Sequence, residues 1–241
     1  MKNSVNSDRS ATRNAPPAFP PPQNRKARIL VVDDHPLFRL GLVELINAQS
    51  DLAVCGEAGD AARAFEMAGI LHPDIVVTDL SLKEVNGLEL IKNINASYPR
   101  IRAVVLSMHD ETLYAERALR AGSYGYMMKE EGAEMVLVAI RRALAGEIFV
   151  SDRMKRRLLQ GFVGGRTPQA GPALTLLSDR ELEVFSSIGK GQSTREIAEH
   201  LRLSVRTVEA YREYIKEKLC LKNGSELVQH AFHYIHESMA V

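Results

Sequence analysis

Four short apolar runs in this chain each end in a charged or hydroxyl-bearing residue. They are Ile29-Leu30-Val31-Val32 before Asp33-Asp34, Ile75-Val76-Val77-Thr78 before Asp79, Ala103-Val104-Val105-Leu106 before Ser107, and Tyr124-Gly125-Tyr126-Met127-Met128 before Lys129. A buried parallel strand typically has such a continuous apolar sequence. Open α/β sheets carry their sites outside the carboxyl ends of the strands. The pattern therefore predicts a parallel sheet with carboxylates, a hydroxyl and an ammonium group gathered at one edge.

Apolar runs alternate with amphipathic stretches from about residue 28 to residue 146. Strands are expected near 28–33, 52–57, 74–79, 102–107 and 124–128, and helices near 36–48, 60–71, 87–97, 111–121 and 132–145. Repeated strand-helix units of this kind form a parallel sheet with helices on both faces. We therefore expect a doubly wound α/β fold with five strands.

Composition divides the chain into four parts. Residues 1–24 are polar and rich in proline, and such a stretch is expected to be disordered. The α/β unit should cover 25–150. Residues 151–173 combine a short basic helix near 152–160 with a Gly- and Pro-rich linker. The remaining part, 174–241, is expected to be a separate helical domain.

Charge and cysteine content exclude several classes of protein. The net charge of +1 gives no bulk attraction to nucleic acid or membranes. The only cysteines, Cys55 and Cys220, exclude a disulfide framework and fit a reducing compartment. No run reaches the roughly 18 apolar residues of a membrane span, and no signal-peptide core is present. We expect a cytoplasmic protein with no membrane partner.

The C-terminal part has the start signals of four helices. Ser178-x-x-Glu181 and Ser193-x-x-Glu196 are capping boxes, Ser204 is a plausible N-cap, and Asn223-x-x-Glu226 is a looser cap. Helices near 194–201 and 205–219 are separated by a turn of three residues. This spacing is typical of a helix-turn-helix.

Asp33, Asp34 and Asp79 are expected to lie close together at the sheet edge. Clustered carboxylates repel one another unless a cation neutralises them, and ligation by oxygen alone suits Mg²⁺. An aspartate can accept a phosphoryl group, and Lys129 and Ser107 could hold the transferred oxygens. Each residue alone could be a helix cap or a solvated surface group. Their shared position at strand ends favours a phosphoryl site.

Residues 28–145 resemble the receiver domain of bacterial two-component response regulators, through Asp33-Asp34, Thr78-Asp79, Ser107, Tyr126 and Lys129. The resemblance implies a flavodoxin-like sheet of order 2-1-3-4-5, in which Asp79 takes a phosphoryl group from a sensor histidine kinase. It implies that Asp34, Asp79 and the Ser81 carbonyl bind Mg²⁺, with Asp33 acting largely through water. Ser107 and Lys129 would bind phosphoryl oxygens, and Tyr126 would turn inward as Ser107 moves.

Residues 174–236 are similar to the LuxR-type helix-turn-helix. The similarity is carried by Leu177-Ser-Asp-Arg-Glu-Leu-Glu-Val184, by Gly191-Gln-Ser-Thr-Arg-Glu-Ile-Ala198, and by Leu203-Ser-Val-Arg-Thr-Val-Glu-Ala-Tyr-Arg212. Together the two resemblances point to the NarL/FixJ class of response regulators.

The helix near 205–219 is expected to read DNA with its outward face. At 100° per residue, Val208, Tyr211, Ile215 and Leu219 share the inward face. The expected DNA contacts are Arg206, Thr207, Glu209, Arg212, Lys216 and Lys218. Some relatives carry lysine at positions 209 and 213, where this chain has glutamate. Glu209 could instead accept from a cytosine amino group, or dimerisation and phosphorylation could supply much of the affinity.

The last helix carries an apolar stripe and a histidine series. Val228, Ala231, Phe232 and Ile235 could pair two DNA-binding domains, with dimers matching a two-fold symmetric operator. The histidines His230, His233 and His236 could bind a metal, although an exposed face or the dimer seam is a better interpretation.

The resulting hypothesis is a transcription factor controlled by phosphorylation, with a sensor histidine kinase, duplex DNA and a second copy of itself as partners. It would be a phosphoryl acceptor with self-phosphotransfer chemistry, and no enzyme. The unphosphorylated receiver would restrain the DNA-binding domain or leave it monomeric. A haloacid-dehalogenase-like phosphatase is an alternative, but that family needs a second aspartate where Ser81 stands. A second alternative makes the receiver a phosphorylation-independent interaction module.

Overall fold

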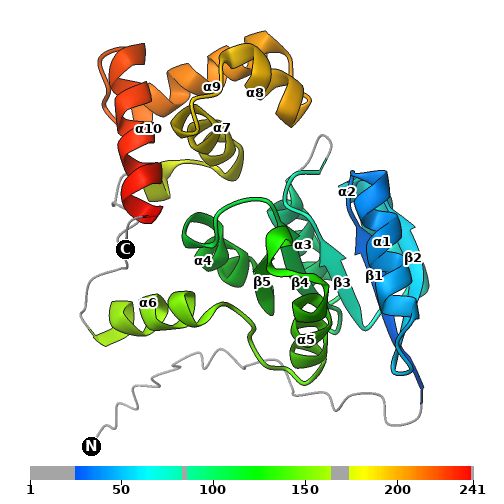
Figure 1. Ribbon diagram of the computed structural model, residues 1–241. Coiled ribbons are helices and arrows are strands. Elements are labelled where there is room, and N and C mark those ends of the chain that lie inside the picture. The colour runs from blue at the N-terminus through cyan, green and yellow to red at the C-terminus, as the bar shows by residue number, and fades with distance from the viewer. Residues whose placement is uncertain (1–24, 83–85, 164–173, 240–241) are drawn as a thin grey trace, which may run out of the picture.

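The computed structural model describes residues 25–82, 86–163 and 174–239. The predicted disordered tail and most of the predicted linker lie outside these residues. Along the described chain, an α/β unit comes first, a single helix follows it, and a helical unit ends it (Figure 1). No helix within the described ranges is long and apolar enough to cross a membrane.

The sheet has five parallel strands in the order β2-β1-β3-β4-β5. Their bounds are β1 Ala27–Val32, β2 Leu52–Ala58, β3 Ile75–Thr78, β4 Arg102–Ser107 and β5 Gly125–Met128. The predicted fold and strand order are confirmed. Strand β3 is buried throughout, which explains its uninterrupted apolar sequence. The chain reverses its lateral direction after β2, so the carboxyl ends of β1 and β3 lie at the switch point where such sheets hold their sites.

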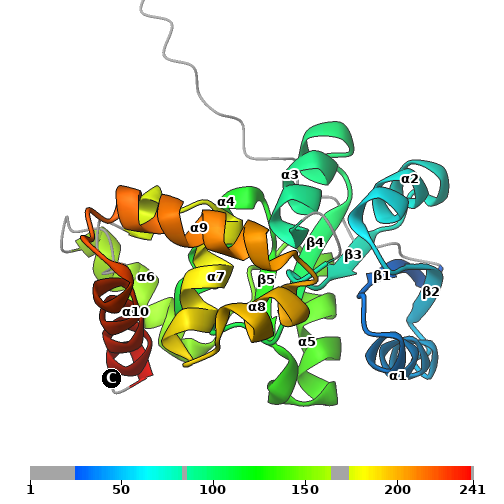
Figure 2. The same ribbon diagram turned by 90° about the horizontal axis from the view of Figure 1, so that it is seen from above.

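Helices cover both faces of this sheet. They are α1 Pro36–Asn47, α2 Ala61–Leu71, α3 Gly87–Ser97, α4 Glu111–Ala121 and α5 Ala133–Leu144. Figure 2 shows α1 and α5 on one face and α2, α3 and α4 on the other. Two apolar clusters fill the space between the sheet and its helices, one of them beneath α1 and α5 and the other beneath α2 and α3. Every predicted strand and helix of this unit is present within one residue of its expected bounds.

The segment after α5 returns to the sheet edge before entering the next helix. Phe149 bridges to Gly125 beside β5, and its carbonyl accepts from the Tyr126 N–H. The Glu111 carboxylate then accepts from both the backbone and the hydroxyl of Ser151. Helix α6, Asp152–Val163, continues three residues beyond the predicted basic helix, and its Met154 is buried.

The C-terminal unit consists of α7 Asp179–Gly189, α8 Thr194–Leu201, α9 Val205–Lys218 and α10 Gly224–Met239, preceded by a 3-10 turn at Leu174–Leu176. Ser178 and Ser193 form the predicted capping boxes, and Ser204 caps α9 through the Thr207 N–H. The helix-turn-helix expected from spacing is therefore present in α8 and α9.

A third hydrophobic cluster joins the two units. A single cluster of buried apolar residues extends from α3 and α4 into α7, and it includes Leu88, Tyr114 and Leu182. In Figure 1 the C-terminal helices lie over one end of the α/β unit, next to α3 and α4. This packing places the helix-turn-helix close to the carboxyl edge of the sheet.

Candidate functional site

A buried lysine joins two aspartates at the carboxyl edge of the sheet. Lys129 Nζ lies 2.6 Å from Asp33 Oδ2 and 2.6 Å from Asp79 Oδ2. The three side chains are 4%, 3% and 2% exposed, respectively. They follow β5, β1 and β3, whose parallel register carries all three to the same edge. The structure thus brings together the residues that the strand ends predicted.

The acidic residues form a group with the geometry of a cation site. Asp33, Asp34, His35 and Asp79 offer ligand atoms that all lie within 4.8 Å of one another. Asp34 Oδ1 is buried and accepts no hydrogen bond, and His35 Nδ1, 2.8 Å away, lies outside hydrogen-bonding geometry. A buried carboxylate oxygen without a donor is costly unless a cation approaches it. The donor set is therefore suited to a hard divalent cation, which prefers oxygen ligands.

The lysine of the pocket is held in its charged form. Burial alone would lower the pKa of Lys129, but the charge of Asp79 and the hydrogen bonds that Lys129 donates to Asp33 and Asp79 raise it above the usual value. The ammonium group also lies 4.4 Å from the centroid of the Phe38 ring, within cation–π range. Lys129 is thus a fixed positive charge in direct contact with the Asp79 carboxylate.

Ser107 and Tyr126 lie on the adjoining strands and are fully buried. Ser107 Oγ accepts a hydrogen bond of 3.3 Å from the His109 N–H. The Tyr126 hydroxyl donates to the His109 carbonyl at 2.8 Å, so the ring is already turned inward. Both hydroxyls therefore converge on the segment that follows β4.

His109 is a pocket residue that we did not predict. It is 4% exposed, and its Nε2 lies 2.8 Å from Ser81 Oγ. Burial lowers its pKa to about 4 against the opposing charge of Asp79, with Lys190 and His200 lowering it further. The imidazole is therefore neutral near pH 7. The sequence signal for this role was its position two residues after Ser107. A single histidine after a strand is not specific, because such residues are usually structural.

Backbone packing ties the pocket to α3. The amide of Gly87, the first residue of α3, donates to the Leu80 carbonyl at 2.8 Å. A Cβ at position 87 would overlap the Asp79 carbonyl, so only glycine fits there. Asp79 Oδ1 in turn accepts from the Ser81 N–H at 3.3 Å. The start of α3 and the Asp79 backbone are thus in direct contact.

Helix α9 presents its predicted outward face to solvent. Val208 and Ile215 are fully buried, as expected for the inward face. Of the predicted DNA contacts, Arg206, Glu209 and Lys218 are exposed, whereas Thr207, Arg212 and Lys216 are half-buried. Two of them form ion pairs within the unit: Lys216 lies 2.8 Å from Glu213, and Lys218 lies 2.6 Å from Glu181. Lys218 would have to leave Glu181 before it could contact phosphate.

Helix α10 divides the predicted apolar stripe between two faces. Ala231 and Ile235 are buried against α7, because their side of the helix meets Gly189. Val228 and Phe232 are 42% and 55% exposed. Only the second pair remains for pairing between copies. The described histidines of this helix, His230 and His233, are exposed and belong to no metal-binding group among the residues that the structure describes.

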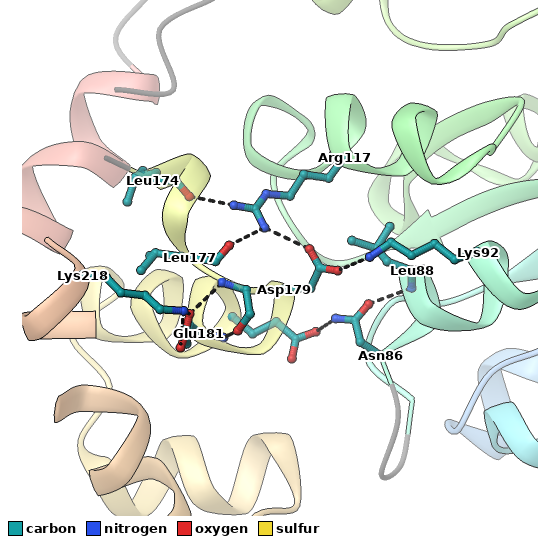
Figure 3. A network of polar contacts seen from close by, with 11 residues as sticks. Asn86, Leu88, Lys92, Arg117, Leu174, Leu177, Asp179, Glu181 and Lys218 are labelled. Carbon is teal, nitrogen blue, oxygen red and sulfur yellow. Dashed lines mark hydrogen bonds and ion pairs between the residues drawn. The ribbon is translucent and has the colours of Figure 1, made fainter. Parts of the chain in front are cut away.

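Polar contacts across the two units surround α7 (Figure 3). Arg117 of α4 donates to the Leu174 and Leu177 carbonyls and to Asp179, at 2.7, 2.9 and 2.9 Å. Lys92 of α3 lies 3.2 Å from the same aspartate. These contacts position the N-terminus of α7 against α3 and α4.

Two further contacts join the units. Arg180 donates to the Leu82 carbonyl at 3.0 Å. Arg202, in the turn between α8 and α9, lies 2.8 Å from Asp34 Oδ2. Of these four residues only Asp34 was predicted to be functional, as a Mg²⁺ ligand. The two contacts themselves were not predicted, because they join segments that are remote along the chain.

An acidic pocket on a doubly wound sheet, combined with a helix-turn-helix, defines a receiver joined to a DNA-binding domain. Two family models match accordingly: the response regulator receiver domain over residues 29–141, and the luxR family of bacterial regulatory proteins over residues 175–231. The chain belongs to the NarL/FixJ class of response regulators, which regulate transcription in two-component systems. The wider domain limits of 25–150 and 174–241 stay predictions.

Known proteins show the same combination. The chain is 36% identical over 208 residues to the oxygen regulatory protein NreC of Staphylococcus aureus (strain bovine RF122 / ET3-1), covering 85% of this chain and 96% of that protein. A LuxR-family response regulator from Aurantimonas sp. SI85-9A1 is 34% identical with a TM-score of 0.54, covering 57% of this chain and 99% of that one. RcsB of Salmonella typhimurium shares the fold, with a TM-score of 0.59, 23% identity, and coverage of 87% and 98%.

Proposed function

We propose that Asp79 is the phosphoryl acceptor of this regulator, that the donor is a sensor histidine kinase, and that transfer depends on Mg²⁺. The observation that carries this proposal is the buried ammonium group of Lys129, 2.6 Å from both Asp33 and Asp79. In the reaction, an Asp79 oxygen bonds to phosphorus as the P–N bond of the donor phosphohistidine breaks, and the imidazole leaves with the electron pair.

The residues around Asp79 fit the needs of that step. Lys129 holds one carboxylate oxygen and remains close enough to bind a transferred phosphoryl oxygen. Ser107 provides a hydroxyl at the neighbouring strand end. Asp33, Asp34, Asp79 and the Ser81 carbonyl would hold Mg²⁺, as supported by the undonated oxygen of Asp34. Bound there, Mg²⁺ would neutralise charge on the transferring phosphoryl group.

The output is binding of α9 to duplex DNA as a homodimer. Arg206, Thr207, Arg212, Lys216 and Lys218 are the proposed contacts, with Glu209 as a reader of base edges. Support comes from the exposure of this helix face and from a solved structure of RcsB that is described as bound to a promoter. The exposed pair Val228 and Phe232 is the proposed seam between copies.

The test is chemical labelling of the acceptor. The protein is incubated with Mg²⁺ and a small acyl phosphate, and intact-mass spectrometry counts the added phosphoryl groups. Wild type should gain one group, and Asp79→Asn should gain none. Asp152→Asn is the matched control, because this side chain is 82% exposed on α6 and should leave uptake unchanged. Normal uptake by the Asp79 variant would refute the assignment and point to another acceptor residue, whereas no uptake by wild type would favour a phosphorylation-independent receiver.

A further inference from the structure

Arg202 connects the DNA-binding unit directly to the acidic pocket. It is the C-cap residue of α8, with φ of 54° and ψ of 42°, and it belongs to the turn between the two helices of the helix-turn-helix. Its Nη1 lies 2.8 Å from Asp34 Oδ2. The Asp34 side chain is 6% exposed, whereas that of Arg202 is 45% exposed. The guanidinium group thus approaches a buried carboxylate from the solvent side.

The two oxygens of Asp34 have different surroundings. Oδ2 is paired with Arg202, and Oδ1 is buried without a donor beside His35. Oδ1 belongs to the same group of carboxylates as Asp33 and Asp79. A cation among these carboxylates and a guanidinium on Oδ2 would share one negative charge at close range. Because like charges repel strongly at a poorly solvated site, each weakens the binding of the other.

The geometry points to a competition between Arg202 and Mg²⁺ for Asp34. In this closed arrangement, with the DNA-binding unit packed on the receiver, Arg202 lowers the affinity of the pocket for Mg²⁺. By thermodynamic reciprocity, bound Mg²⁺ weakens the ion pair between Arg202 and Asp34 by the same factor. The helix-turn-helix turn is therefore coupled to cation occupancy before any phosphoryl group arrives. This inference rests on the Mg²⁺ site proposed above.

Three other contacts between the units use none of the pocket carboxylates as a partner. Arg117 and Lys92 bind Asp179 on α7, and Asn86 binds Glu183 one turn later. These contacts can persist while Arg202 leaves Asp34. Mg²⁺ would thus loosen the turn between α8 and α9 while the N-terminus of α7 remains on α3 and α4.

The experiment is a calorimetric titration of the full chain with MgCl₂. Arg202→Asn removes the cation but keeps a residue that tolerates the left-handed conformation. It should bind Mg²⁺ about fivefold more tightly than wild type, at the lower end of typical couplings between sites. Arg202→Lys restores the charge and should return the affinity toward wild type.

Controls separate this inference from the site on which it depends. Arg195→Ala removes a charge from the exposed surface of the same helix and should leave Mg²⁺ affinity unchanged. Asp34→Asn should greatly weaken binding. If wild type and Arg202→Asn bind Mg²⁺ equally while Asp34→Asn does not bind, the competition is refuted and the site stands. If Asp34→Asn binds as wild type does, or no variant binds, the proposed Mg²⁺ site itself is wrong.

Discussion

Asn86 Nδ2 donates a 2.6 Å hydrogen bond to Glu183 Oε1, which joins the start of α3 to a carboxyl group of α7 that is fully buried. Burial raises the pKa of Glu183 to about 7, although Arg180, 2.7 Å from the other oxygen, acts in the opposite direction. The proton of this carboxyl group is therefore linked to the packing of the receiver against the DNA-binding unit.

The first prediction concerns pH and follows from this raised pKa. As pH rises from 4.5 to about 7, the unfolded chain releases the Glu183 proton while the folded protein retains it. The free energy of unfolding should therefore fall through this window, by about 3 kcal/mol, and level off above it. Glu183→Gln should remove this part of the pH dependence in denaturant unfolding. A variant whose profile still parallels that of wild type would contradict the assignment.

The second prediction concerns release of the DNA-binding unit. Arg117→Ala removes donors to Leu174, Leu177 and Asp179, which should destabilise the closed arrangement by about 2 kcal/mol. If closure opposes DNA binding, the unphosphorylated variant should bind DNA up to roughly 30-fold more tightly in fluorescence anisotropy. Arg120→Ala is the control, since Arg120 pairs with Glu116 inside α4. Equal affinities for both variants would argue against restraint by this contact.

The third prediction concerns the pocket charge. Lys129→Ala leaves Asp33 and Asp79 buried and unneutralised, so the free energy of unfolding should fall by about 3 kcal/mol. Adding Asp33→Asn to this variant should recover part of the loss, because one unpaired charge is removed. A double-mutant cycle from chemical denaturation measures the coupling. Additive effects of the two substitutions would show that Lys129 and Asp33 do not interact.

The fourth prediction concerns phosphate contacts made by α9. Replacing Arg212 by alanine should weaken binding to all DNA sequences and reduce the slope of log affinity against log salt by about 1. Arg63→Ala, on the exposed surface of α2, should leave the slope unchanged. A wild-type slope near zero would rule out phosphate contacts by the cations of this helix.

The sheet and the pocket were predictable because both follow from local sequence. Buried strands need continuous apolar runs, and parallel strands carry their last residues to one edge, which places Asp33, Asp79 and Lys129 together. The start of each C-terminal helix was predictable for a similar reason, since Ser178 and Ser193 cap within three residues.

The contacts between the units could not be predicted in this way. Asn86 and Glu183 are 97 positions apart, and each has an ordinary local explanation as a helix cap or a solvated acid. Likewise, helical periodicity placed Ala231 and Ile235 on the apolar stripe that was expected to pair two DNA-binding domains. Packing of α10 against Gly189 instead buries both residues within one copy. Such pairings depend on how two surfaces fit, and no short-range pattern encodes that fit.

The close approach of Gly87 to the Asp79 carbonyl gives the receiver a mechanical linkage. Because Gly87 has no side chain, the backbones of residues 79 and 87 pack closely together. A displacement of about a few tenths of an ångström at Asp79 would therefore shift the first turn of α3. That helix also carries Lys92, and Asn86 immediately precedes it, so both contacts with α7 move with it. A larger residue at position 87 would displace the start of α3 from the Asp79 carbonyl permanently. It would thus imitate a shift of this helix without phosphorylation of Asp79.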